Sequence, residues 1–280
     1  MRSNSKRWPD TAISTASEAE PLATGAVTTL MTRATRLFSV FAAPVLWLTL
    51  ASFAHGAETI TVQSPPTRTA VIELYTSEGC SSCPAADQWF EQLIKLPAEE
   101  LNMLALSFHV DYWDYIGWKD IFASPKFTDR QHAYARAAGK RMVYTPQMVI
   151  AGQDHVVGAK PGEVSRLIKA HSKTPDPVKL SVTRKGDRLE IMAEPLQEGL
   201  GRMVVQMVRF KDGQTVRIKR GENAGRDLSY SNVVTEWEVL KEWNGRSPLS
   251  ISAKITGDDD CVIIIQRASH GPVLAAARVR

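Results

Sequence analysis

The sequence has few cysteines, and their small number excludes one class of protein. Its 280 residues include only three cysteines, too few for a small domain held together by several disulfides. Stability must therefore come from packed apolar cores, which a hydrophobic content of 44% can supply. Cys80 and Cys83 are separated by two residues, which leaves Cys261 as the unpaired third cysteine.

The sequence also lacks a strong excess of charge. The formal net charge is +4 over 280 residues, and basic residues are mixed with acidic ones, which is typical of a solvated surface. We therefore expect no nucleic-acid partner. The glycine-bearing stretch Arg220–Arg226 lacks the Gly-Lys-Ser/Thr ending of a phosphate-binding loop, so we do not expect nucleotide binding. It is better explained as a shaped connection that packs on another part of the protein.

No apolar run is long enough to favour a transmembrane helix. The run at residues 37–50 follows Arg33 and Arg36, is interrupted by Pro44, and precedes the small-residue sequence Ser52-Phe53-Ala54. A basic, then apolar, then small order is typical of a secretory signal peptide. We expect residues 1–57 to be a disordered leader plus this signal, with a true start at residue 1 or 31.

Removal of the signal would leave a periplasmic or secreted protein with no membrane attachment. We place the cleavage after Ala54 or Ala57, because both follow the apolar run at a small residue. Export would bring Cys80 and Cys83 into an oxidising compartment, where disulfide chemistry is common.

Cys80 and Cys83 lie between a predicted strand (69–75) and a predicted helix (85–96). Cys80 is therefore expected at or just before a helix N-terminus, where the free N–H groups and the helix dipole favour a thiolate. Pro84 suits the first helical turn. This setting indicates a redox or soft-metal site, with a static structural disulfide as the alternative. A zinc site is disfavoured, because no second Cys-x-x-Cys or close Cys/His pair exists.

The predicted order of elements after the cysteines resembles the thioredoxin fold. Strand, helix and strand are followed by an aromatic and helical insertion (111–141), then by two strands and a last helix. The resemblance implies that the Thr145–Pro146 bond is cis, that Pro146 packs against the disulfide, and that the backbone before it pairs with bound substrate. We expect this α/β thioredoxin-like domain with helical insertion to span residues 58–172.

Several longer motifs resemble the secreted thioredoxin-like family known as domain of unknown function 1223. The resemblance covers about residues 69–280 and implies the fold and export, but it supplies no substrate. The motifs that carry it are Glu73–Pro84, Ser107–Asp114, Val143–Met148, Arg220–Arg226 and Cys261.

Glu73 is the nearest candidate for the buried acid that thioredoxin uses in proton transfer. It lies one position further from Cys80 than that acid does. A one-residue shift along a strand reverses the side to which the residue points. We therefore expect Glu73 to face away from the cysteines unless the intervening loop absorbs the extra residue.

Other candidate site residues follow the second predicted strand (101–110). Side chains at the C-terminal ends of parallel strands commonly build binding sites. In this interpretation they form a peptide- or ligand-binding lip beside Cys80; the alternative is that the insertion packs a small core of its own. The substrate-binding candidates are His109, Asp111, Trp113 and Tyr144.

The chain beyond a linker near residues 171–177 alternates between apolar and polar residues in short runs. Regular short strands with glycine-bearing turns predict an all-β, antiparallel sandwich-like domain, which we place at residues 173–280. Cys261 begins a strongly apolar strand and is expected to be buried and inert. Its alternative role is that of a third thiol that exchanges with the Cys80–Cys83 disulfide.

These observations favour a thiol–disulfide oxidoreductase that needs no organic cofactor. Cys80 would attack through a mixed disulfide, Cys83 would resolve it, and Thr145 with Pro146 would hold the partner. The partners would be protein or small-molecule thiols and disulfides.

Two other function classes remain open from the sequence. The first is a Cu(I)-binding protein that uses Cys80, Cys83 and His109, because soft thiolates select that metal. The second is a non-catalytic interaction module with a structural disulfide.

Overall fold

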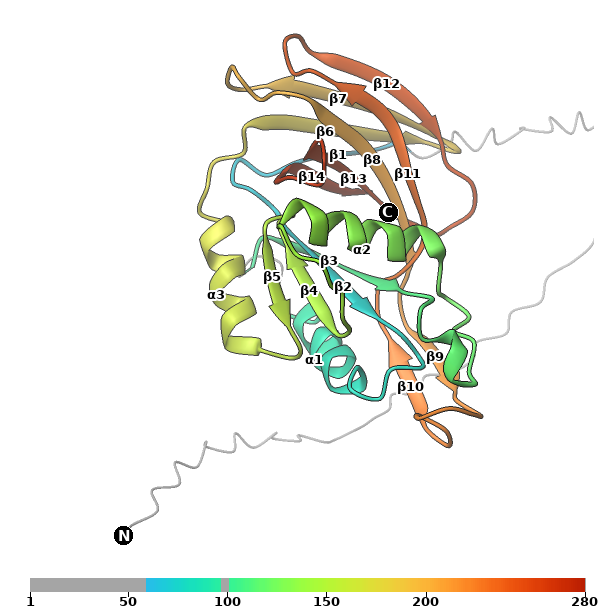
Figure 1. Cartoon of the computed structure of the whole chain (residues 1–280). Helices are drawn as coiled ribbons and strands as arrows, with labels where there is room; N and C mark the ends of the chain where they lie inside the picture. Colours follow the sequence, from blue (N-terminus) through green and yellow to red (C-terminus); the bar gives the residue numbers. More distant parts are fainter. Residues whose placement is uncertain (1–58, 97–100, 280) are drawn as a thin grey trace, which may run out of the picture. The chain divides into compact units, whose positions relative to one another are not determined.

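The computed structural model describes residues 59–96 and 101–279. Strands dominate the described part of the chain, and helices are few (Figure 1). The helices are α1 (Pro84–Ile94), the short 3-10 helix η1 (Asp114–Ile116), α2 (Pro125–Ala137) and α3 (Pro161–His171). The strands are β1 (Thr59–Gln63), β2 (Ala70–Thr76), β3 (Met103–His109), β4 (Gln147–Ile150), β5 (Asp154–Val157), β6 (Val178–Lys185), β7 (Arg188–Pro195), β8 (Met203–Lys211), β9 (Gln214–Arg217), β10 (Asp227–Tyr230), β11 (Val233–Trp243), β12 (Leu249–Lys254), β13 (Asp260–Arg267) and β14 (Val273–Val279).

Eight of these strands form one mixed sheet, in the order β14-β13-β8-β11-β3-β2-β4-β5. At its centre β2 and β3 run parallel, from the pair Ala70 and Met103 to the pair Thr76 and His109. β11 is the other parallel neighbour of β3, whereas β4, β5, β8, β13 and β14 pair antiparallel with their neighbours. The sheet therefore joins strands from both sides of the linker near residue 172.

The expected fold class, an α/β thioredoxin-like domain with a helical insertion followed by a separate all-β sandwich-like domain, is wrong. The structure is mostly β, and the described residues contain only three α-helices. Sequence periodicity showed that β3 is apolar, but it carries no information about which strand lies beside it. One of the two strands that pair with β3 is β11, more than a hundred residues later in the chain.

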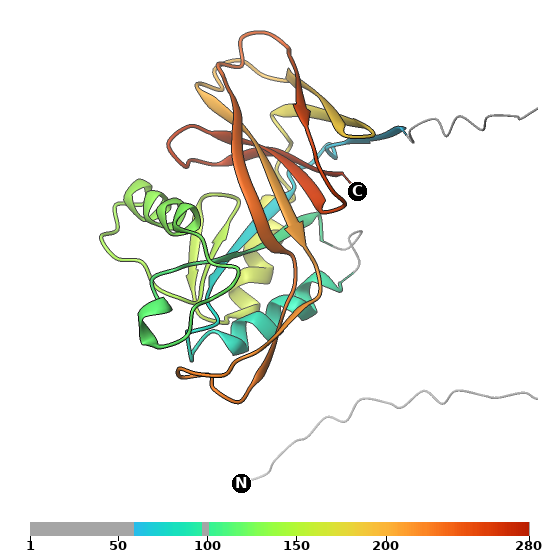
Figure 2. The same cartoon turned by 90° about the vertical axis from the view of Figure 1, so that its right-hand side faces the viewer.

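A smaller sheet, β1-β6-β7-β12, packs against one end of the large sheet. Apolar residues of β6 and β7 form one core with residues of β8, β13 and β14, and Figure 2 shows these strands gathered in one part of the molecule. β1 reaches this sheet from the N-terminal side of β2 and pairs with β6. The other end of the large sheet, which contains β3, β2, β4 and β5, packs against the helices.

The two faces of β2 pack against different helices, because successive side chains of a strand point to opposite sides. Ile72 and Leu74 lie in one core with residues of α1 and α3. Val71 and Tyr75 lie in another core with Phe108 and residues of α2. α1 and α2 therefore cover opposite faces of β2.

Glu73 belongs to the α2 face, so it points away from α1 as the register argument predicts. Arg130 on α2 donates to both carboxylate oxygens of Glu73, at 2.7 and 2.8 Å, and Tyr134 donates at 2.6 Å. Burial acts to raise the pKa of Glu73, but the Arg130 charge and these hydrogen bonds outweigh it and hold that pKa below its ordinary value. Arg130 also donates to Gln206 and Gln266, which ties α2 to β8 and β13.

The hairpin of β9 and β10 extends from the large sheet toward α1 (Figure 2). Its apolar residues Leu228 and Tyr230 pack with Trp118 and Phe122, which follow β3. The hairpin therefore lies against the segment that leaves the C-terminal end of β3. Its tip, residues 218–226, is close to the loop that bears the cysteines.

The expected leader, signal peptide and cleavage positions fall on residues 1–58, outside the described residues. Among the described helices, none combines the length and apolarity needed to cross a membrane. The longest is α2, with 13 residues.

Candidate redox site

The Cys80–Cys83 disulfide lies in the loop between β2 and α1, which we call the cysteine loop (residues 77–83). Cys83 is the N-cap of α1 and Pro84 occupies its first turn, so the predicted setting of the cysteines at a helix N-terminus is confirmed. Both cysteines are 0% exposed, so neither sulfur is the more accessible one. Ser81 and Ser82 between them are exposed.

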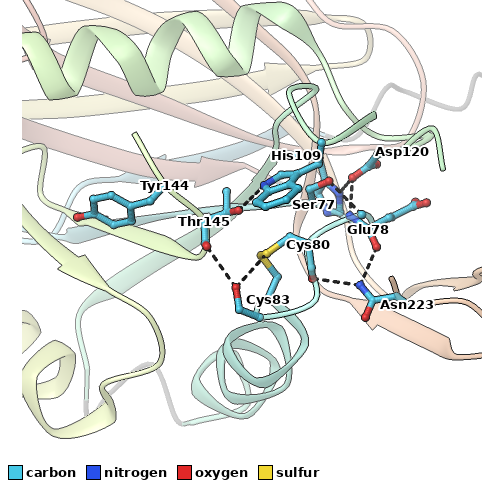
Figure 3. Close-up of a disulfide and its surroundings, with 12 residues drawn as sticks. Ser77, Glu78, Cys80, Cys83, His109, Asp120, Tyr144, Thr145 and Asn223 are labelled. Atoms are coloured by element: carbon cyan, nitrogen blue, oxygen red, sulfur yellow. Dashed lines mark hydrogen bonds and ion pairs between the residues drawn. A yellow bond between two sulfur atoms is a disulfide. The ribbon is translucent and has the colours of Figure 1, made fainter. Parts of the chain in front are cut away.

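Thr145 and Trp113 border the cysteine loop on one side. The Thr145–Pro146 bond is cis, as the resemblance implied. The Ser82 hydroxyl donates to the Thr145 carbonyl at 3.4 Å, and the Trp113 indole donates to the Thr145 hydroxyl at 2.7 Å. Figure 3 shows Thr145 next to the cysteines. A Cβ on Gly79 would lie 3.2 Å from the Cβ of Trp113, so the loop approaches this tryptophan closely.

A buried group of ionisable side chains lies behind the loop, on the α1 side of the sheet. His109 Nδ1 and Asp120 Oδ2 are 2.7 Å apart, and the Glu78 backbone N–H donates to the same oxygen at 2.8 Å. The Trp118 indole donates to the Glu78 carboxylate at 2.5 Å. His109 is 0% exposed, so the interpretation that it belongs to a surface lip is wrong. His109 is the last residue of β3, and the alternation of side chains along the strand directs it to the face of the sheet that α1 covers.

Burial and mutual charge set the protonation of this group. Burial acts to lower the pKa of His109, but Asp120 outweighs it and raises that pKa. Burial acts to raise the pKa of Asp120, and the His109 charge and hydrogen bond outweigh it, so that pKa is lowered. Both shifts favour the imidazolium–carboxylate form of the pair. Burial, followed by the Asp120 charge, raises the pKa of Glu78 to about 7.

Asp87 completes the group from α1, one helical turn after Cys83. Its backbone N–H donates to the Cys83 carbonyl at 3.0 Å, and its side chain is 6% exposed. Neither Asp87 carboxylate oxygen, nor His109 Nε2, has a hydrogen-bond partner among the described residues. Burial raises the pKa of Asp87 to about 7, although the His109 charge opposes the rise.

Asp87, like Asp120 and Glu78, is a site residue that the sequence analysis did not name as a candidate. An acidic residue in the first turn of a helix has an ordinary explanation, since it complements the helix dipole from the surface. Its place on the same helix face as Ala86, Phe90 and Leu93, which are also buried, was the only available signal. A cavity of about 280 Å³ between α1 and the β9–β10 hairpin is lined by Asp87 together with Glu91 and Arg226.

Asp111 and Tyr144, the other proposed lip residues, do not face the sulfurs. Asp111 accepts a hydrogen bond from the Thr128 hydroxyl at 2.5 Å, which ties it to α2. The Tyr144 ring points away from the disulfide (Figure 3). Of the four expected binding residues, only Trp113 borders the cysteine loop.

Asn223, at the tip of the β9–β10 hairpin, binds the cysteine loop from the other side. Its Nδ2 donates to the carbonyls of Glu78, at 2.9 Å, and Cys80, at 3.0 Å (Figure 3). Arg226 donates to the Asn223 Oδ1 at 2.9 Å. The prediction that the stretch Arg220–Arg226 packs on another part of the protein is confirmed.

Cys261 lies in β13, in the core shared by the two sheets, and is 0% exposed. Burial raises the pKa of its thiol to about 12, which leaves it protonated at neutral pH. The expectation of a buried cysteine is confirmed. The core that contains it does not include the cysteine loop, so the structure offers no contact between the Cys261 thiol and the disulfide.

The described residues contain no assembled ligand set for the Cu(I) alternative. Within residues 59–96 and 101–279, no three side chains of His, Cys, Asp or Glu are grouped so that they could hold a metal ion. His109, the third proposed ligand, bonds Asp120 through Nδ1, and its Nε2 has no hydrogen-bond partner among the described residues.

Comparison with known proteins relates the chain to one family. The sequence model of the family described as "Protein of unknown function (DUF1223)" matches residues 71–266. No curated protein is significantly similar to the chain. A crystal structure of a protein from Agrobacterium tumefaciens is 33% identical over 77% of this chain and 96% of that one, with a TM-score of 0.62. HBP35 of Porphyromonas gingivalis shares the fold, with a TM-score of 0.55, 12% identity, and coverage of 77% of this chain and 76% of that one.

Proposed function

This chain belongs to the family described as protein of unknown function DUF1223, and we propose that it is a thiol–disulfide oxidoreductase that works through Cys80 and Cys83. The observation that carries the proposal is the disulfide at the N-terminus of α1, backed by the buried group of His109, Asp120, Glu78 and Asp87. Buried ionisable groups with shifted pKa values are concentrated at functional sites.

The exchange proceeds in two balanced steps. A substrate thiolate attacks the Cys80 sulfur, a mixed disulfide forms, and Cys83 leaves as a thiolate at the N-terminus of α1, which stabilises negative charge. A second substrate thiolate then attacks the substrate sulfur of the mixed disulfide and releases Cys80. The substrate dithiol is oxidised to a disulfide while the protein disulfide is reduced. The reverse sequence reduces a substrate disulfide.

Cys80 is assigned as the exchanging sulfur on its surroundings. The exposed residues Ser81 and Ser82 follow it, and the Ser82 hydroxyl lies 3.4 Å from its sulfur, close enough to donate a hydrogen bond to a Cys80 thiolate. Cys83 is the N-cap of α1 and lies one turn from Asp87. Cys83 is therefore the resolving residue, and Thr145 with Pro146 holds the partner chain beside the loop.

Asp87 is the proton carrier for Cys83 in this mechanism. A carboxyl group whose pKa is about 7 can both accept and release a proton near neutral pH. It takes the proton of the Cys83 thiol when that sulfur attacks the mixed disulfide, and it returns the proton when Cys83 leaves. The cavity beside Asp87 provides a short route for the proton to solvent.

The proposal includes export, because the N-terminal sequence has the order of a secretory signal. In the periplasm or outside the cell the partners are protein or small-molecule thiols and disulfides. The disulfide itself carries two electrons, so the mechanism requires no organic cofactor.

A structural disulfide in a non-catalytic interaction module is the second candidate. The observation that favours it is the complete burial of both sulfurs. Replacing Cys83 with Ser separates the two candidates. The oxidoreductase accumulates covalent adducts between Cys80 and its partners, because the resolving thiol is missing.

The trapping experiment is read on non-reducing gels of exported protein, followed by mass spectrometry of the adducts. Cys80→Ser is the matched control, and it traps far less. Cys261→Ser leaves the wild-type result unchanged, because that thiol is buried in another core. A Cys83→Ser variant that folds and forms no adducts would leave the structural disulfide as the better account.

A further inference from the structure

The burial of both sulfurs requires that the site move before it can react. Exchange needs a thiolate to contact a disulfide sulfur, yet Cys80 and Cys83 are each 0% exposed. The cysteine loop is the element that must move, because its residues Ser81 and Ser82 already lie at the surface. What holds this loop therefore controls the reaction.

Many hydrogen bonds of the cysteine loop are internal or long, and two short ones, from the Glu78 N–H to Asp120 and from the Trp118 indole to the Glu78 carboxylate, fix the start of the loop. The Cys80 N–H donates to the Ser77 carbonyl within the loop, and the Gly79 N–H donates to the Ser77 hydroxyl. The contact from Ser82 to Thr145 is 3.4 Å, long for a hydroxyl donor. The two short bonds from Asn223, to the carbonyls of Glu78 and Cys80, come from far along the chain.

Asn223 is held in the orientation that these bonds require. Arg226 donates to its Oδ1, so its Nδ2 faces the cysteine loop. The tip is seated by Gly221, whose φ is +76° and at which a Cβ would lie 3.3 Å from the Cβ of Trp118. Trp118 in turn donates to the Glu78 carboxylate. The tip, Trp118 and the cysteine loop thus form one continuous set of contacts.

The part of the tip beyond Ile218 is built so that it can leave without exposing apolar surface. Ile218 is buried with Leu228 and Tyr230 at the base of the tip. From residue 219 to residue 226, Asn223 is the only buried residue, and the other seven residues are exposed. Hydrophobic burial therefore contributes little to holding the tip closed. The hydrogen bonds of one amide supply most of the attachment.

We propose that Asn223 is a latch, a positioning residue that holds the cysteine loop closed over the disulfide and must release it before a thiol can reach either sulfur. Arg226 sets the latch by orienting the Asn223 amide. The proposal rests on the proposed redox function, because a latch has a purpose only where the disulfide exchanges. The latch assigns a role to the stretch Arg220–Arg226, which takes no part in the exchange reaction of the cysteines.

The test is the rate at which dithiothreitol reduces the Cys80–Cys83 disulfide of the full chain. Samples are quenched with an alkylating reagent, and the labelled thiols are counted by mass spectrometry. Asn223→Ala removes both bonds, and we expect the rate to rise roughly tenfold, as the net loss of two hydrogen bonds implies. Arg226→Ala leaves the donors but frees the amide, so its rate should lie between those of Asn223→Ala and wild type.

Matched controls separate the latch from a general loosening of the hairpin. Ser229→Ala removes an exposed hydrogen bond to Thr215 between β9 and β10 and should leave the rate unchanged. Asn223→Asp keeps the shape of the side chain but has no amide donor, and it should react at least as fast as Asn223→Ala. This variant keeps the test decisive if Asn223→Ala does not fold. Amide hydrogen exchange at Gly79 and Cys80 should quicken in both Asn223 variants and stay unchanged in Ser229→Ala.

The outcomes of this test are independent of the proposed function. Folded Asn223 variants that are reduced at the wild-type rate, or more slowly, would overturn the latch even if the wild type catalyses exchange. A roughly tenfold faster rate supports the latch, and it does so even if no protein substrate is found. A Ser229→Ala rate that rises with the others would show that the hairpin acts as a whole, which contradicts a latch at Asn223.

Discussion

Replacing Asp87 with Asn tests the buried proton carrier through stability and rate together. The pKa of Asp87 is raised from 3.8 to about 7, and roughly three units at about 1.4 kcal/mol each amount to about 4 kcal/mol. Because the pKa of this acid is higher in the folded state, the protein loses stability as the pH rises from about 4 to about 7. At pH 8 the folded wild-type protein is destabilised by the full free energy of ionising the buried Asp87 carboxyl. The Asn variant has no group to ionise there and is not destabilised in this way.

We therefore expect Asp87→Asn to unfold at higher urea concentration than wild type at pH 8, by up to about 4 kcal/mol, and to show little difference at pH 4. The same variant should exchange disulfides about a hundredfold more slowly, the lower range of general acid–base catalysis. A protein that becomes more stable and less active is the signature of a group kept for function.

Asp176 provides the matched control for this prediction. It is 5% exposed, both of its carboxylate oxygens lack partners among the described residues, and burial raises its pKa to about 7 despite the opposing charge of Arg68. It precedes β6, remote from the cysteine loop in the chain. Asp176→Asn should also raise stability at pH 8, but it should leave the exchange rate unchanged. An Asp87→Asn variant that exchanges at the wild-type rate, or gains no stability at pH 8, would refute the reasoning.

Two further predictions concern the core and the N-terminus. Glu73→Gln leaves the buried Arg130 without its charge partner and should lower the free energy of unfolding by about 3–5 kcal/mol in urea titrations; a loss below 1 kcal/mol would show that this ion pair does not hold α2 to the sheet. The exported protein should begin after Ala54 or Ala57, as N-terminal sequencing will show, and a membrane-bound product that retains Met1 or Met31 would contradict the signal peptide.

Local features of the site could be read from the sequence. The strand, turn and helix around the cysteines, and the face to which Glu73 points, follow from side-chain periodicity over a few residues. The cis bond at Thr145–Pro146 came from the family resemblance rather than from the pattern. These features depend on neighbours in the chain or on a motif that is itself local.

Long-range features escaped the sequence analysis for physical reasons. The pairing of β3 with β11 joins strands more than a hundred residues apart, and an apolar strand shows only that it is buried. His109, Asp87 and Asn223 are polar residues at strand ends, helix starts and turns, where polar side chains usually meet solvent. Their burial results from the β9–β10 hairpin and residues 117–122 closing over them, and no local pattern records that.

The reduction potential of the Cys80–Cys83 pair tests the central claim most directly. The protein is equilibrated with glutathione buffers of known potential, and the fraction of reduced cysteine is measured by alkylation and mass spectrometry. A redox-active disulfide should have a potential between about −270 mV and about −120 mV, the range of dedicated oxidoreductases. A potential below about −300 mV, typical of structural disulfides, would contradict the account.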